Sequence, residues 1–224
     1  MEIKFMEDKW DDFHSKEEFH TKYPSEHVVR FLFSQFSRVV AERKYIKILD
    51  AGCGAGRHTS LCATEGFDTY YTDISQEALK VTAERLRREG LKATSEKASV
   101  EKLPFADEFF DGLVSFGVLY YNDMNGLNNA ISEIYRVLKK GGKAFVLTTT
   151  KDDYRCGKGK QVSGNTYLLD ITDTNEEGMI LHFLDEHEIG AVFNVFKEIG
   201  VGKSEVTIVN SQRKDSHWII ILKK

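Results

Sequence analysis

The stretch KILDAGCGAGRHTS, residues 47–60, constrains the fold of this chain more than any other. A short apolar run indicates a buried strand, and the glycines at 52, 54 and 56 indicate a tight turn whose backbone approaches a ligand closely. Such a turn follows the first strand of a parallel sheet, where ligands bind beyond the carboxyl ends of the strands. The stretch therefore predicts an α/β fold with a site for a nucleotide-like ligand.

Strand-like segments alternate with amphipathic helices along the rest of the chain. The predicted strands are residues 46–50, 68–74, 93–98, 111–118, 143–150, 205–210 and 217–222, and the predicted helices are residues 25–40, 57–65, 76–89, 126–140 and 185–199. This alternation is typical of a mostly parallel sheet covered by helices on both faces. The last two strands are joined by a short turn, so they run antiparallel to each other.

Composition and charge favour a small-molecule partner. The chain has 31 basic and 35 acidic residues and a net charge of −4, which is not the positive excess that nucleic acid or an anionic membrane attracts. Cys53, Cys62 and Cys156 form no CxxC pair, as is typical of free thiols in a reducing compartment. No signal-peptide pattern and no membrane-spanning apolar run of about 20 residues is present. We therefore expect a cytoplasmic protein without nucleic-acid or membrane partners, and the histidine spacing predicts no metal site.

Two ligand classes fit the glycine turn, a nicotinamide dinucleotide and S-adenosylmethionine. Asp73, at the end of the second predicted strand and about 20 residues downstream, can accept ribose hydroxyls in either case. Asp50 separates the two, because a carboxylate about 5 Å from a pyrophosphate costs about 3 kcal/mol at an effective dielectric constant of about 20. The ammonium and sulfonium of S-adenosylmethionine would instead be attracted. The turn also has the spacing G-x-G-x-G and lacks the third glycine of G-x-G-x-x-G.

Four motifs in order resemble the class I S-adenosylmethionine-dependent methyltransferases, in particular the large bacterial group of small-molecule methyltransferases with a type 11/25-like domain. They are the D-x-G-x-G-x-G loop at residues 50–56, the acid Asp73, EKLPFADEFFDGLVS at 101–115 and EIYRVLKKGGKAFV at 133–146. The resemblance covers most of residues 46–150. It implies a Rossmann-like, doubly wound, three-layer α/β/α fold with seven strands in the order 3-2-1-4-5-7-6, strand 7 being antiparallel.

The resemblance also implies which residues bind the methyl donor. These are Asp50, Gly52, Cys53 and Gly54 at the methionine, Asp73 at the ribose, Ile74, Ser99, Val100 and Glu101 around the adenine, and Phe116 and Gly117 beside the methionine and the methyl group. Two positions depart from the family pattern. Ser99 stands where relatives often have an acid, and LYYND at 119–123 stands where many have a histidine.

The expected activity is transfer of a methyl group from S-adenosylmethionine to an oxygen or nitrogen atom of a small molecule, with S-adenosylhomocysteine as product. Weak candidates for a catalytic base are Tyr121, Tyr154 and His182. Each has a structural alternative, as a pocket wall, a loop aromatic or a buried structural histidine. An NAD(P)-binding oxidoreductase and a non-catalytic S-adenosylmethionine-binding module stay open as alternatives.

We expect one domain over residues 1–224, with residues 1–45 as a helical cap and residues 151–183 as an insertion that forms a substrate lid. Trp10 or Tyr23 would line the acceptor pocket from the cap, although the cap could equally cover a sheet edge. The insertion is longer than an ordinary connection, so it is either functional or poorly ordered. Its cations Arg155, Lys158 and Lys160 either clamp an anionic substrate or belong to a solvated loop. The sequence leaves open a monomer or a homodimer.

Overall fold

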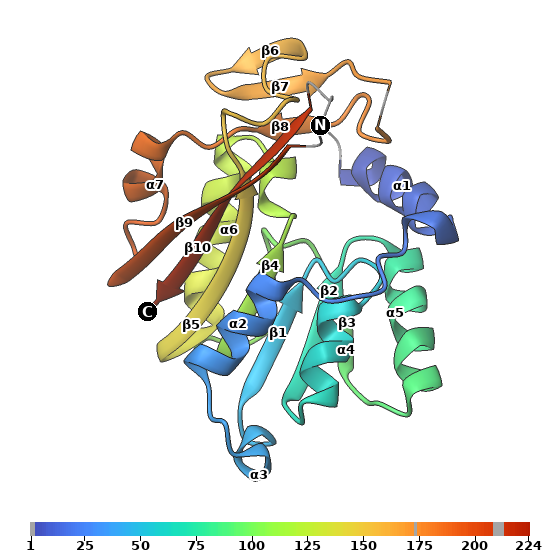
Figure 1. Ribbon diagram of the computed structural model, residues 1–224, viewed down its shortest axis with the longest axis vertical. Coiled ribbons are helices and arrows are strands. Elements are labelled where there is room, and N and C mark those ends of the chain that lie inside the picture. Colours follow the sequence, from blue (N-terminus) through green and yellow to red (C-terminus); the bar gives the residue numbers. More distant parts are fainter. Residues whose placement is uncertain (1–2, 173, 208–212) are drawn as a thin grey trace.

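A seven-stranded sheet organises the computed structural model, which describes residues 3–172, 174–207 and 213–224 (Figure 1). Its strands are β1 (Lys47–Ala51), β2 (Asp68–Asp73), β3 (Thr94–Lys97), β4 (Phe110–Phe116), β5 (Leu138–Thr149), β9 (Glu198–Thr207) and β10 (Lys214–Lys223). Their spatial order is β3-β2-β1-β4-β5-β10-β9. The strands β1 to β5 are parallel, whereas β10 pairs antiparallel with both β5 and β9. The predicted topology, including its antiparallel strand, is confirmed.

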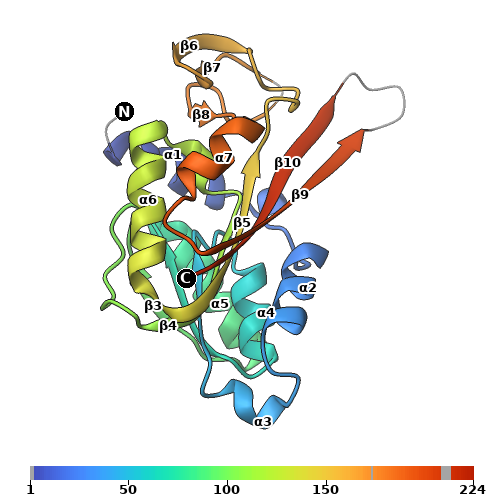
Figure 2. The same ribbon diagram turned by 90° about the vertical axis from the view of Figure 1, so that its left-hand side faces the viewer.

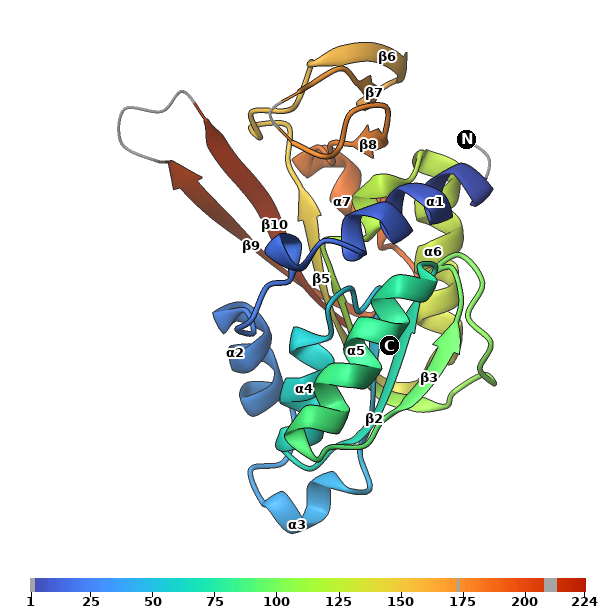
Figure 3. The same cartoon turned by 90° about the vertical axis from the view of Figure 1, so that its right-hand side faces the viewer.

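Helices cover both faces of the sheet, as Figures 2 and 3 show. They are α1 (Ile3–His14), α2 (Glu26–Gln35), α3 (Val40–Arg43), α4 (Arg57–Thr64), α5 (Gln76–Glu89), α6 (Met124–Val137) and α7 (Glu186–Val192), with short 3-10 helices at Glu17–Phe19 and Leu119–Tyr121. Successive side chains of a strand point to opposite faces. Ile48 accordingly packs with α2 and α4, while its neighbour Leu49 packs with α6 and α7. The buried sheet therefore has an apolar core on each side.

Local capping signals predict α5 closely. The Ser75 hydroxyl accepts a hydrogen bond from the Ala78 N–H at 3.0 Å, and Gly90 ends the helix with a φ of 69°. A capping box of Asp185 and Glu188 likewise begins α7. These signals lie within a few residues of the helix ends, so the sequence alone reveals them.

Three predicted helices end earlier than expected. The helix predicted over 25–40 ends at Gln35, that over 126–140 ends at Val137, and that over 185–199 ends at Val192. In the second case Leu138 pairs with Phe110, so the residues before Gly141 already belong to β5. In the third, Glu198 and Ile199 pair with β10. Pairing with distant strands thus overrides the helical pattern.

Residues 151–183 fold into a small antiparallel sheet rather than a poorly ordered loop. Its strands are β6 (Gly159–Ser163), β7 (Thr166–Leu169) and β8 (Ile180–His182), in the order β6-β7-β8. Leu169, Met179, Leu181 and Phe183 form an apolar cluster that packs on Tyr120, next to the carboxyl end of β4. The insertion therefore has its own core and rests on the edge of the main sheet where the strands end.

The β9–β10 hairpin projects beyond the rest of the sheet (Figures 2 and 3). The strand predicted over 205–210 is the distal part of β9, and its residues 208–210 lie outside the described part of the chain. Among the described residues, no helix is long and apolar enough to cross a membrane.

Candidate active site

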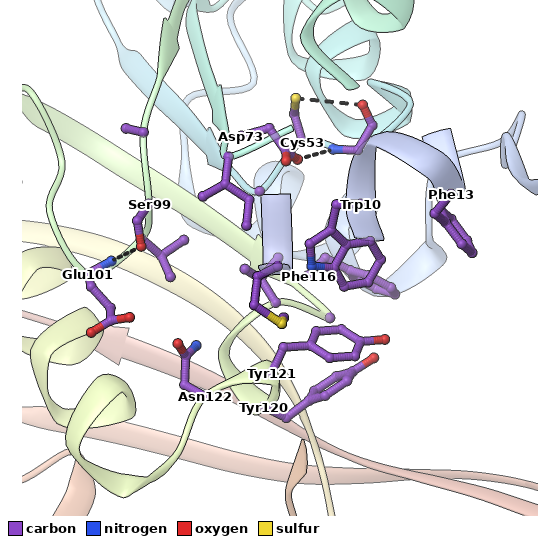
Figure 4. A pocket seen from close by; sticks show the side chains of 18 of the residues that line it. Trp10, Phe13, Cys53, Asp73, Ser99, Glu101, Phe116, Tyr120, Tyr121 and Asn122 are labelled. Atoms are coloured by element: carbon purple, nitrogen blue, oxygen red, sulfur yellow. Dashed lines mark hydrogen bonds between the residues drawn. The ribbon is translucent and has the colours of Figure 1, made fainter. Parts of the chain in front are cut away.

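A cavity of about 640 Å³ opens at the carboxyl ends of β1, β2 and β4 (Figure 4). Its walls come from the glycine loop after β1, the end of β2, residues 98–101 after β3, the end of β4, and α1. All residues expected to bind the methyl donor line this cavity except Asp50. The residues that the resemblance names therefore meet around one cavity, and their binding of the methyl donor stays a prediction.

The side chain of Asp50 lies behind the glycine loop and not in the cavity. It is 1% exposed, and the Thr59 hydroxyl of α4 donates a hydrogen bond to its Oδ2 at 2.6 Å. Burial raises the pKa of Asp50 to about 6. The alternation of side chains along β1 places Asp50 on the side that the first turn of α4 covers, and its contact with the methyl donor stays a prediction.

The N–H groups of the glycine loop are occupied by the protein itself. Gly52 and Cys53 donate to the Thr72 carbonyl at 2.8 and 2.9 Å, and Gly54 donates to Oδ2 of Asp73 at 2.9 Å. A Cβ on Gly52 would lie 2.3 Å from a methyl group of Val118, and Gly52 has a φ of +78°. Glycine is therefore required here by the packing and the backbone conformation as well as by any ligand.

Asp73 is the buried carboxylate that faces the cavity. Its Oδ1 accepts the Ser75 N–H at 2.9 Å, and its Oδ2 accepts the Gly54 N–H. Burial raises its pKa to about 6, against the lowering effect of these hydrogen bonds. At neutral pH the side chain is mostly ionised, and it can still accept hydrogen bonds from hydroxyls in the cavity.

The residues after β3 form the opposite wall. The Ser99 hydroxyl accepts the Glu101 N–H at 3.2 Å, and Oε2 of Glu101 accepts a hydrogen bond from Asn129 at 3.2 Å. Ile74 and Val100 add apolar surface to this part of the cavity. The wall can therefore receive a flat ring between apolar side chains.

The other end of the cavity is aromatic. Figure 4 shows the Trp10 ring of α1 beside Tyr121, with a centroid distance of 4.7 Å, and Tyr120 lies 4.4 Å from Tyr121. Met6, Phe13, Phe19, Phe116 and Ile180 also line this end. Of the two cap residues considered from the sequence, Trp10 lines the cavity, whereas Tyr23 is 72% exposed and lies outside it.

The three base candidates are separated by the fold. Tyr121 lines the cavity, but its hydroxyl donates to Oε1 of Glu176 at 2.6 Å. Burial, together with neighbouring Tyr120 and Glu176, raises the pKa of Tyr121 well above its usual value. Tyr154 and His182 do not line the cavity. His182 forms a 2.9 Å hydrogen bond with Thr166 inside the insertion, which fits a structural histidine.

The polar residues of the cavity wall that were not singled out from the sequence include His14, Arg57 and His58. Burial lowers the pKa of His14 to about 4 and that of His58 to about 3, so both rings are neutral at pH 7. The Arg57 guanidinium lies 4.7 Å from the centre of the Phe116 ring. Arg57 and His58 directly follow the last glycine of the loop, and this position could have identified them as cavity residues from the sequence. No local sequence signal identifies His14 in this way.

Among the described residues, no group of three or more histidine, cysteine, aspartate or glutamate side chains is arranged to hold a metal ion. The insertion cations have other partners. Arg155 pairs with Asp153 and Glu176, and Nζ of Lys158 lies 4.7 Å from the centre of the Tyr154 ring. Neither lines the cavity.

Sequence comparison identifies the part of the chain that builds the cavity. Residues 49–146 match a family model described as a methyltransferase domain. A ubiquinone/menaquinone biosynthesis C-methyltransferase, UbiE, of Pectobacterium carotovorum is 37% identical over 115 residues, or 49% of this chain and 45% of that protein. The UbiE protein of Burkholderia mallei is 36% identical over 109 residues, or 47% of this chain and 44% of that protein. The matches thus span less than half of these relatives.

Structural comparison extends the likeness to most of the fold. A SAM-dependent methyltransferase from Methanosarcina mazei has a TM-score of 0.68 at 22% identity, with 85% of this chain and 98% of that chain covered. The 1,6-didemethyltoxoflavin-N1-methyltransferase of Burkholderia thailandensis, solved with its substrate and S-adenosylhomocysteine, has a TM-score of 0.59 at 16% identity, with 83% and 76% covered. At these identities the likeness concerns the fold.

Proposed function

We propose, from the premise that residues 49–146 form a methyltransferase domain of the class I S-adenosylmethionine-dependent family, that this chain transfers a methyl group from S-adenosylmethionine to a small molecule. The observation that carries the proposal is the bonding of the glycine loop. The N–H groups of Gly52, Cys53 and Gly54, which a pyrophosphate would need, already donate to Thr72 and Asp73. A phosphate-free nucleoside fits such a loop better than a dinucleotide.

In this proposal Asp73 accepts the ribose hydroxyls of the donor, and Ile74 and Val100 enclose the adenine. The methionine part lies along Gly52, Cys53 and Gly54 and against Phe116 and Gly117, which all line the same cavity. Asp50 acts on the cationic donor through its electric field across the loop and not by contact. A carboxylate within about 6 Å still attracts a cation in a partly buried site.

Methyl transfer is a displacement at a carbon that the sulfonium already activates. The protein contributes most by holding the acceptor atom about 3 Å from the methyl carbon and in line with the breaking bond. The aromatic end of the cavity, with Trp10, Phe116 and Tyr121, favours a flat and largely apolar acceptor. Proton removal is not assigned to Tyr121, because its hydroxyl already donates to Glu176.

The acceptor atom that fits this site best is an electron-rich carbon. His14 and His58 have pKa values of about 4 and 3, which makes them poor bases for an alcohol or a phenol. A carbon of an electron-rich ring attacks first and loses its proton afterwards, when that proton is acidic enough to pass to a weak base such as the neutral His14 ring of the cavity wall. The relatives at 36–37% identity are named C-methyltransferases, which supports carbon over the oxygen or nitrogen expected from the sequence.

Two segments cover the aromatic end, and we propose that both close over the acceptor. Helix α1 contributes Trp10 and Phe13, and β8 of the insertion contributes Ile180. Closure of this kind excludes water from the reacting atoms. The alternative, that residues 1–45 merely cover a sheet edge, does not explain why α1 side chains line the cavity.

Calorimetric titration with S-adenosylhomocysteine and with NADH and NADPH tests the donor assignment. We expect saturable binding of S-adenosylhomocysteine and none of the dinucleotides, and the reverse would establish the oxidoreductase alternative. Incubation with methyl-labelled S-adenosylmethionine and a series of electron-rich phenols and hydroquinones then tests transfer. Carbon-bound label, identified by NMR, is expected; label on oxygen would refute the carbon assignment, and donor binding without transfer to any acceptor would favour a non-catalytic module.

A further inference from the structure

Helix α1 has two faces with different partners. Met6, Trp10, Phe13 and His14 face the cavity, where they form part of its wall. Glu7 and Asp11, one turn apart, face the main domain instead. A carboxylate oxygen of Glu7 lies 3.6 Å from Nζ of Lys97 at the end of β3. The placement of the aromatic wall therefore depends on how this acidic face is held.

Asp11 contacts the main domain at the first turn of α5, at shorter distances than Glu7. Its Oδ1 accepts hydrogen bonds from the Ser75 hydroxyl at 2.6 Å and from the Glu77 N–H at 3.1 Å. Burial raises the pKa of Asp11, but these hydrogen bonds and the charge of Lys97 outweigh it and leave the pKa lowered. Asp11 therefore binds α5 as an ionised side chain at neutral pH.

Ser75 connects this contact to the donor site. Its N–H donates to Oδ1 of Asp73, and its hydroxyl donates to Asp11. Ser75 is thus bonded on the cavity side to Asp73, which we assign to the ribose, and on the other side to Asp11 of α1. Movement of the turn at residues 73–75 and movement of α1 are mechanically linked through Ser75.

We propose that Asp11 is a positioning residue for donor binding, which anchors α1 on the Ser75 turn so that Trp10 and His14 close the donor cavity. The inference rests on the proposed function, because the ligand that it concerns is the methyl donor. His14 supports the link, since its ring is 3.3 Å from the place that a Cβ on Gly54 would occupy. Anchored α1 therefore contacts the glycine loop itself.

The variant Asp11→Ala should weaken S-adenosylhomocysteine binding about tenfold or more, as expected for loss of two hydrogen bonds to a charged group. Alanine favours the helix, so folding should be retained, which circular dichroism checks. Asp11→Asn should bind more tightly than Asp11→Ala and more weakly than the wild type, because both hydrogen bonds go to Oδ1, which the amide keeps without the charge. Asp12→Ala is the matched control, since the Asp12 carboxylate pairs with Lys16 of its own segment.

A second measurement does not depend on the ligand. The chain has two tryptophans, so Trp218→Phe leaves Trp10 as the only emitter. In that background, Asp11→Ala should make Trp10 more accessible to acrylamide quenching before any ligand is added, whereas Asp11→Asn and Asp12→Ala should not.

The outcomes separate this inference from the proposed function. Wild-type protein that fails to bind S-adenosylhomocysteine would refute the proposed function, and quenching would then decide whether Asp11 anchors α1. If the wild type and Asp11→Ala bind S-adenosylhomocysteine equally well, the role of Asp11 is overturned and the proposed function is not. Asp11→Asn as weak as Asp11→Ala would also overturn it, because the charge and not the acceptor oxygen would then matter.

Discussion

At the scale of single residues, two buried carboxylates beside the glycine loop have different surroundings. Asp50 is bound by the Thr59 hydroxyl on the α4 side, whereas Asp73 lines the cavity and is bound by N–H groups of Gly54 and Ser75. Both have a pKa raised to about 6 by burial. Asp73 is therefore the carboxylate to which we assign direct donor recognition, and Asp50 secures the start of α4.

Replacement of Asp73 by alanine should weaken S-adenosylhomocysteine binding about 10- to 100-fold, since hydrogen bonds to a charged group contribute about 1.5–3 kcal/mol. Calorimetry measures the change. Asp68→Asn is the control, because Asp68 lies at the opposite end of the same strand. Unchanged affinity in Asp73→Ala would remove the ribose role from this residue.

Donor affinity should also depend on pH through Asp73. Its pKa in the ligand-free protein is about 6, so the carboxylate that we assign to the ribose hydroxyls is lost as the pH falls through that value. We expect S-adenosylhomocysteine binding to weaken between pH 7.5 and pH 5, with a midpoint at about pH 6 or below, because the bound donor favours the ionised form. The same titration of Asp73→Asn should have a shallower slope, which leaves only the longer-range effect of Asp50, and an equal slope in both proteins would contradict the prediction.

At the scale of elements, the glycine loop and the helix that follows it depend on one close approach. Gly56 has a φ of +75°, and a Cβ there would lie 2.7 Å from the Thr82 side chain of α5. Gly90, at the end of α5, has a similar φ of +69° but nothing within 4 Å of its Cβ position. Alanine at Gly90 would therefore introduce backbone strain alone, whereas alanine at Gly56 would introduce backbone strain and a steric clash.

Gly56→Ala should destabilise the protein by about 2–4 kcal/mol, because it adds overpacking to the strain of the left-handed conformation. Gly90→Ala should cost about 1–2 kcal/mol, from the conformation alone. Urea unfolding of the two variants measures the difference. Equal losses would show that α4 and α5 move apart without cost.

The boundaries of the elements show which signals are local. The limits of α5 follow from Ser75 and Gly90, which act within one helical turn. The end of α6 does not, because Leu138 leaves the helix to pair with Phe110 on β4. Similarly, the buried face of α2 is Val28, Phe31 and Leu32, whereas Val40 of the predicted face is 62% exposed beyond the end of that helix. Pattern gives the existence of these helices, and distant contacts give their ends.

At the scale of the whole molecule, a buried ion network joins the insertion to the main sheet. Arg155 donates to Asp153 at 2.8 Å and to Glu176 at 2.6 Å, and Oδ2 of Asp153 accepts the Ser216 N–H of β10 at 3.0 Å. Glu176 also accepts the Tyr121 hydroxyl. The network thus fixes one wall of the aromatic end relative to the sheet.

Arg155→Met should destabilise the protein by about 3–5 kcal/mol, because it leaves the buried carboxylate of Asp153 and the partly buried carboxylate of Glu176 without a cation. Urea unfolding measures the loss, and Lys158→Met, at an exposed position of the same segment, should change stability by less than about 0.5 kcal/mol. A loss for Arg155→Met no larger than that of the control would mean that the network does not hold the insertion.

The oligomeric state and the cytoplasmic location of the whole molecule stay predictions.

The sequence by itself determined the alternation of strands and helices and, through the motifs that it shares with a known family, the residues that surround the cavity. Those features are set by the glycine loop at 50–56, by Asp73 and by short-range periodicity, which act within one strand-turn-helix unit. Only the tertiary structure decided that Asp50 faces away from the cavity, that the Tyr121 hydroxyl donates a hydrogen bond to Glu176, and that α1 lines the cavity and is bonded to Ser75 through Asp11. The physical reason is that each of these depends on a partner in another segment, and Glu176 and Asp11 meet theirs across 55 and 64 residues of chain.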